Sequence, residues 1–105
     1  MDGAMAEYEK LLTLRERQIG GDPLDTAEAQ VRLAGLHLRV GRIPSGRELL
    51  IRAVPVLERK GGARLAEAYE MLACAEDLSG RGKEAQHYRD KALRAAAIHA
   101  VDAVS

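Results

Sequence analysis

The chain repeats itself at a fixed spacing of 39 residues, and this constrains the fold more than any other feature of its 105 residues. The matching segments, in one register and without a gap, are 27–29 with 66–68, 33–34 with 72–73, 41–42 with 80–81, and 52–53 with 91–92. Self-similarity at such a period indicates copies of one supersecondary unit, each burying its apolar face against a neighbour. The sequence therefore predicts one domain over 1–105, with a half repeat over 5–23, repeat one over 24–62 and repeat two over 63–105.

Each copy has the pattern of a helical hairpin. Apolar residues recur at helical spacing in both copies, at Ala29, Leu33, Leu36 and Val40 and again at Leu65, Tyr69, Leu72 and Ala73. Gly41 and Gly80 are expected to end the first helix of each copy, since glycine reaches the left-handed conformation at low cost. We expect helices over 5–19, 24–40, 44–60, 64–79 and 81–102, and no strands.

Two local features refine these helices. Asp25 or Thr26 can cap the helix over 24–40, because Glu28 follows Asp25 at the spacing of a capping box. Pro55 lies inside the helix over 44–60, where it removes the hydrogen bond to the Ile51 carbonyl and is expected to kink the chain.

Composition excludes several classes of protein. Sixteen basic and sixteen acidic residues give a formal net charge of zero, which argues against a general polyanion binder. The single cysteine, Cys74, allows neither an intrachain disulfide nor a cysteine-rich metal site. No apolar run approaches the ~20 residues of a membrane span, and the acidic N-terminus is unlike a signal peptide. We therefore expect a cytoplasmic protein.

The chain resembles the tetratricopeptide repeat family, most closely the kinesin light chain type that is common in bacterial proteins. The residues that carry the resemblance are Tyr8 to Leu12, Gly21-Asp22-Pro23, Asp25-Thr26-Ala27, Leu33-Ala34, Gly41-Arg42 and Arg52-Ala53. The resemblance implies an all-α fold of about five helices, in which antiparallel hairpins stack as a short right-handed superhelix. It also implies a concave groove that binds peptide segments.

The family pattern places the groove on the first helix of each copy. The positions that it implies are Glu28, Val31, Gly35, Leu38 and Arg39 from copy one, and Glu67, Glu70, Cys74, Asp77 and Leu78 from copy two. The residues with which family members clamp a C-terminal carboxylate are not at these positions. The copy-two set is acidic, which favours a basic or mixed partner segment by electrostatic complementarity. The carboxylates of Glu67, Glu70 and Asp77 form either an acidic docking strip or a solvated helix face.

The chain departs from the family at three core positions. Gly46 replaces a small alanine, and His37 and Glu76 stand where the family usually places an aromatic residue. We expect His37 to be packed and hydrogen-bonded rather than a metal ligand or a base. Cys74 lies between alanines and is expected to be a buried small apolar residue.

Nothing in the sequence indicates catalysis, a metal or a cofactor. Glu84 and His87 have the E-x-x-H spacing of di-iron bundles, but such sites need a second motif and further carboxylates. The expected function is a non-enzymatic interaction module that binds a protein or peptide in its groove. Because terminal repeats need capping, we also expect a homodimer or oligomer through helix 5–19, helix 81–102 or both. An alternative is a component of a bacterial transcriptional regulator that contacts nucleic acid or the transcription machinery.

Overall fold

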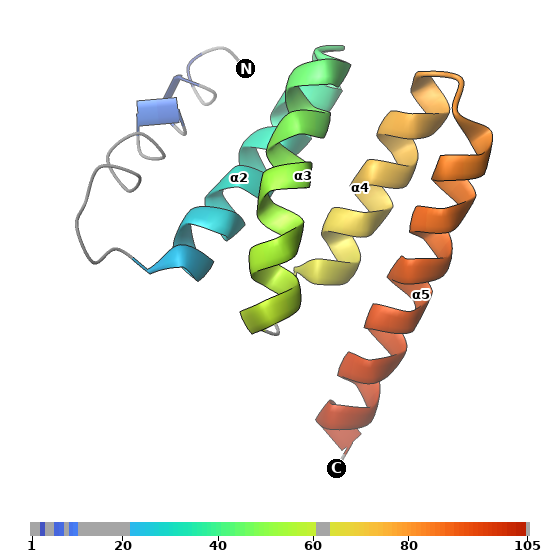
Figure 1. The fold of residues 1–105 in the computed structure, drawn as a ribbon. Helices are drawn as coiled ribbons and strands as arrows, with labels where there is room; N and C mark the ends of the chain where they lie inside the picture. The colour runs from blue at the N-terminus through green and yellow to red at the C-terminus, as the bar shows by residue number, and fades with distance from the viewer. Residues whose placement is uncertain (1–2, 4–5, 8, 11–21, 61–63, 105) are drawn as a thin grey trace.

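The fold is given by a computed structural model that describes residues 3, 6–7, 9–10, 22–60 and 64–104. It contains four helices, α2 (Pro23–Arg39), α3 (Ile43–Lys60), α4 (Leu65–Leu78) and α5 (Gly82–Val104), as Figure 1 shows. There is no strand in these ranges, so the expected all-α class is confirmed. The expected helix count of about five is not matched by these four, because most of the segment expected as a helix over 5–19 lies outside the described residues.

The ends of the helices follow local signals. The observed bounds lie within two residues of the expected ones. The N-cap of α2 is Asp22, whose carboxylate accepts a hydrogen bond of 2.9 Å from the Leu24 N–H. The expected caps Asp25 and Thr26 are wrong, because Pro23 suits the first helical turn and starts the helix before them.

The turns after α2 and α4 have the same geometry. Gly41 and Gly80 have φ angles of 83° and 78°, in the left-handed region that favours glycine. The N–H groups of Arg42 and Arg81 donate 2.8 Å hydrogen bonds to the carbonyls five residues earlier, those of His37 and Glu76. Both glycines therefore end their helices as expected, by satisfying carbonyls that the helix leaves open.

The helices pack as two hairpins side by side. α2 pairs with α3 and α4 pairs with α5, while α3 packs on α4 and α2 touches α4 along one edge (Figure 1). α3 remains helical through the exposed Pro55 as far as Lys60. The kink expected at Pro55 stays a prediction.

The main core lies between the first hairpin and α4. Its fully or almost fully buried members are Ala27, Val31, Ala34, Leu50, Ala53, Leu57, Ala68 and Leu72. Many of these residues are alanines, which lets the helix backbones approach closely. Leu33 and Leu72 stand 39 residues apart and are 3% and 1% exposed, but Leu33 belongs to a second small cluster with Ala29. Leu72 belongs to the main core between the first hairpin and α4, whereas the Leu33 cluster is packed against Leu36 of α2 and Leu49 of α3.

Tyr69 connects α4 to the end of α3. Its side chain is buried, and its hydroxyl donates a 2.9 Å hydrogen bond to the Glu58 carboxylate. Burial, and then this hydrogen bond to Glu58, raise the pKa of Tyr69 to about 12. The phenol is therefore protonated and available as a donor at neutral pH.

A buried carboxylate links three parts of the structure. Glu76 on α4 is 1% exposed. Its Oε1 accepts a 2.5 Å hydrogen bond from Nε of Arg47 on α3, and its Oε2 lies 3.5 Å from Nη1 of Arg81 in the turn before α5. Because the charge is buried and paired, Glu76 holds α4 at a fixed place on the first hairpin.

His37 occupies the position 39 residues before Glu76 and is also buried. Its Nε2 lies 3.8 Å from Oε1 of Glu9. Its Nδ1 has no hydrogen-bond partner in the part of the chain that the structure describes. His37 is packed as expected, but the expected hydrogen bonding is not found at this nitrogen.

Replacing Arg47 by alanine should lower the free energy of unfolding by about 2–3 kcal/mol, because Glu76 then keeps only its longer contact to Arg81. The matched control is Arg52→Ala on the same helix, whose partner Glu48 is exposed, and it should change stability by less than about 0.5 kcal/mol. Urea denaturation followed by circular dichroism measures both. Equal effects of the two substitutions would contradict the role given to Glu76.

Candidate functional site

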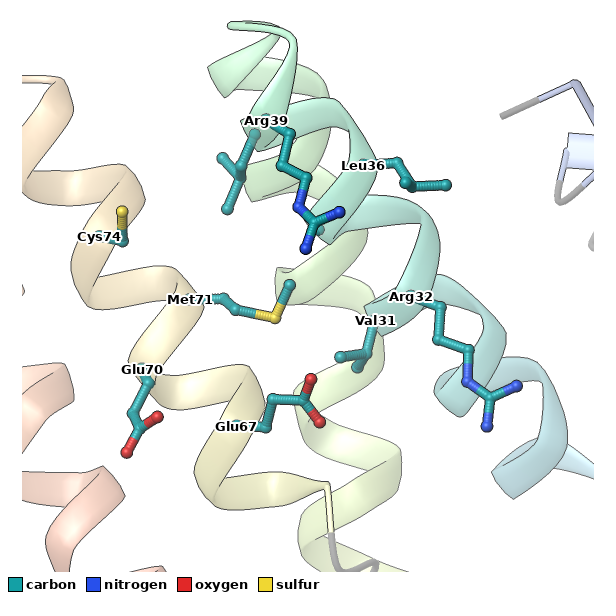
Figure 2. Close-up of a pocket in the computed structure, with 10 residues that line it drawn as sticks. Val31, Arg32, Leu36, Arg39, Glu67, Glu70, Met71 and Cys74 are labelled. Atoms are coloured by element: carbon teal, nitrogen blue, oxygen red, sulfur yellow. The ribbon is translucent and has the colours of Figure 1, made fainter. Parts of the chain in front are cut away.

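The candidate site is a groove between α2 and α4. A cavity of about 520 Å³ opens there, lined by Val31, Arg32, Gly35, Leu36, Leu38, Arg39, Glu67, Glu70, Met71 and Cys74. Figure 2 shows Met71 reaching from α4 toward Val31 on α2, with charged side chains around them. A concave apolar surface edged by polar groups is the usual form of a binding site.

The structure brings together five of the eight residues predicted for partner binding. Val31, Leu38, Arg39, Glu67 and Glu70 all line this cavity. Gly35 and Cys74, the further groove positions implied by the family pattern, line it as well. The family pattern assigns each of these positions along its own helix only. They meet in one cavity because of the way α4 lies against α2.

The other three predicted residues lie outside this cavity. Glu28 contacts Arg64, whose Nε lies 3.3 Å from its Oε2. Asp77 lines a neighbouring cavity of about 470 Å³ between α4 and α5, where it forms an ion pair with Arg89. Leu78 is 63% exposed and lines neither cavity.

The charges of the groove are segregated by helix. Arg32 and Arg39 lie on α2, whereas Glu67 and Glu70 lie on α4. The expected acidic strip is therefore only one side of the groove, and two basic residues line the other side. Glu67 is partly neutralised by Arg64, whose Nη1 donates a 2.9 Å hydrogen bond to it.

Three of these charged groups have no partner in the ranges that the structure describes. Arg32, Arg39 and Glu70 form neither a hydrogen bond nor an ion pair with any residue there. The opposite charges on α2 and α4 thus do not close the groove by pairing across it. Their hydrogen-bonding capacity remains available to a ligand.

The floor of the groove depends on one glycine and one methionine. A Cβ atom at Gly35 would lie 2.9 Å from the Met71 ε-carbon, so the missing side chain provides the space into which Met71 extends. Met71 is half-buried and flexible, and methionine adapts to surfaces of different shape. The floor can therefore adjust to the apolar side chains of a partner.

Cys74 is exposed, which corrects the expectation that it is buried. It lies on the side of α4 that borders both cavities rather than on the side that packs against α3. Its alanine neighbours Ala73 and Ala75 are the buried ones, because they lie on other faces of the helix.

The predicted groove positions missed Leu36, and also Arg32 and Met71, which stand 39 residues apart. All three line the cavity beside predicted positions. The spacing of seven residues between Arg32 and Arg39 places them on one face of a helix and could have identified Arg32. No sequence signal indicated Met71, whose place in the floor depends on the absence of a side chain at Gly35.

Among residues 22–60 and 64–104 and the described positions before them, no group of three His, Cys, Asp or Glu side chains could hold a metal ion. No helix within these same ranges is long and apolar enough to cross a membrane.

Comparison with known proteins gave no match: neither a protein-family model, nor a curated protein, nor a solved structure is significantly similar to this chain.

Gly35→Ala should leave stability unchanged or raise it by up to about 1 kcal/mol, because alanine favours the helix and the end of Met71 can move aside. The matched control is Gly46→Ala, where a Cβ would lie 3.1 Å from the Ala34 carbonyl oxygen, which cannot move freely. It should lower stability by about 1–2 kcal/mol.

Denaturation gives both stabilities, and NMR of the Met71 methyl group shows whether its environment changes. A loss of stability in Gly35→Ala as large as in Gly46→Ala would show that the groove floor is rigid.

Proposed function

We propose that the chain is a non-enzymatic protein-interaction module that binds a partner segment in the groove between α2 and α4. The observation that carries this proposal is an open groove with an apolar, adjustable floor between charged edges, of which Arg32, Arg39 and Glu70 are unpaired within the described ranges. Apolar side chains of a partner would cover Val31 and Met71, and its polar groups would pair with the edges.

The same proposal includes a tetratricopeptide-like architecture for the two hairpins. It is supported by the matching turns at Gly41 and Gly80 and by matched burial at positions 39 residues apart. The matched pairs are Ala29 and Ala68, Leu33 and Leu72, Ala34 and Ala73, Gly46 and Ala85, and Ala53 and Ala92. In such an architecture the first helices of successive hairpins line one common surface, and here those helices are α2 and α4.

Peptide selection tests groove binding directly. Peptides selected from a random displayed library on the wild-type protein should bind Gly35→Leu at least tenfold more weakly, about 1.4 kcal/mol, because leucine fills the space above Met71. Gly82→Leu is the matched control, since a Cβ there meets no atom within 4 Å and the position lies outside the groove. Fluorescence anisotropy measures the affinities.

Methyl NMR of the wild-type protein shows independently where the peptides bind, even if Gly35→Leu folds poorly. The expected perturbations are at Val31, Leu38 and Met71. Failure to select any binder, or binders that perturb none of these residues, would count against the groove.

We further propose that the protein self-associates through α5. This helix carries two exposed large apolar residues, Leu93 at 71% and Ile98 at 65% exposure. Beyond its contact with α4, α5 continues toward the C-terminus (Figure 1). Two large apolar side chains exposed to this extent would be removed from water in an interface between copies, which favours association.

Light scattering at micromolar concentration should give about twice the chain mass of 11.4 kDa for the wild-type protein. Leu93→Glu combined with Ile98→Glu should return the mass to that of a monomer, because charges placed in an apolar interface oppose association. Leu78→Glu, at an equally exposed leucine on α4, should leave the mass unchanged. A monomeric wild-type protein would overturn this part of the proposal.

A further inference from the structure

We infer that the groove binds an amphipathic helical segment in a direction fixed by charge, with the acidic edge of the segment along α2 and its basic edge along α4. This inference rests on the proposed binding function of the groove. It adds the conformation of the partner, the distribution of its charges and the direction in which it lies.

The charges of the groove are segregated between its two edges. Among the residues that line the cavity, the charged ones on α2 are basic, Arg32 and Arg39, and those on α4 are acidic, Glu67 and Glu70. Glu67 is also ion-paired with Arg64. The four formal charges sum to zero, so a partner of uniform charge would gain at one edge and lose at the other. Only a partner with acidic groups on one side and basic groups on the other is complementary to both edges.

The spacing of the charges favours a helical partner. Arg32 and Arg39 are seven residues apart, which is two turns or about 10.5 Å along α2. Acidic side chains at positions i and i+7 of a parallel or antiparallel helix repeat at that same interval. Side chains on one face of an extended strand repeat at about 6.8 or 13.6 Å, which matches the two arginines less well.

The floor of the groove requires that the partner carry an apolar stripe. Val31 and Met71 lie between the two charged edges (Figure 2), so an apolar stripe would lie in the middle of the bound face. A helix with an apolar stripe between an acidic and a basic edge is complementary to this surface in one direction only. When such a helix is turned end to end with its stripe still on the floor, its two charged edges exchange places.

The experiment uses two designed peptides of about 14 residues, or four helical turns, that share one apolar stripe. One carries Glu on the first edge and Lys on the second, and the other has these edges exchanged. Each bears a nitroxide on its N-terminal residue, attached through a linkage that does not react with Cys74. Loss of methyl NMR signal at Val31 or at Leu38 shows which end of the groove is near the label.

The two peptides should bind with similar affinity and in opposite directions, so that the label quenches Val31 with one peptide and Leu38 with the other. Control peptides with Lys on both edges or Glu on both edges should bind about fivefold more weakly at low ionic strength. Added salt should reduce this difference, because the edges are exposed.

The protein variant Arg32→Glu/Arg39→Glu/Glu70→Lys provides the reciprocal test. These three side chains have no ion-pair partner in the described ranges, so their exchange breaks no pair seen in the structure. Each peptide should bind this variant in the opposite direction to that seen with wild type. A matched variant, Arg59→Glu/Arg94→Glu, changes basic residues outside the groove and should not alter the direction.

The outcomes separate this inference from the proposed function. If both peptides bind with the label at the same end, or at both ends equally, the inference is overturned while groove binding stands. If neither designed peptide binds but library-selected peptides perturb Val31 and Met71, the helical and charge-ordered partner is overturned alone. If no peptide of either kind binds, both proposals fail.

Discussion

Glu76 carries a negative charge that would be costly to bury alone, and Arg47 and Arg81 surround it from two different segments. Arg47 belongs to α3 and Arg81 to the turn that leads into α5, so the three residues connect the two hairpins. The apolar contacts of Leu72 and Ala68 with the first hairpin stabilise the packing of α4, but such contacts do not by themselves fix its orientation. The ion pairs of Glu76 fix that orientation. The groove exists because α4 is held where its Met71 reaches toward α2.

The helices were predictable from sequence because their ends are determined locally. Gly41 and Gly80 end helices through their own backbone conformation, which depends little on the remainder of the chain. The N-cap of α2 was missed for an equally local reason. Two capping signals compete there, Asp22 followed by Pro23 and Asp25 followed by Glu28, and the helix begins at the first of them. The segment expected as a helix over 5–19 lies largely outside the residues that the structure describes.

The groove could be predicted only in part, because it depends on the rotation of one helix against another. The resemblance to the tetratricopeptide repeat pattern assigned Val31, Gly35 and Glu70 to a groove, and all three line the cavity. It could not show that Cys74 is exposed or that Met71 fills the space above Gly35, since both depend on the contact of α4 with α2. A formal net charge of zero likewise concealed the separation of basic and acidic side chains on opposite edges.

The ion pair between Asp77 and Arg89 places two charges where a further hairpin would stack if the 39-residue pattern continued. These residues stand 39 positions after Leu38 and Leu50, which belong to the core beneath α4. Another hairpin added to α4 and α5 in the same manner would have to remove these two charges from water, at a cost that a leucine pair does not impose. Stacking of a further hairpin on α4 and α5 in this manner is therefore disfavoured at this edge of the fold.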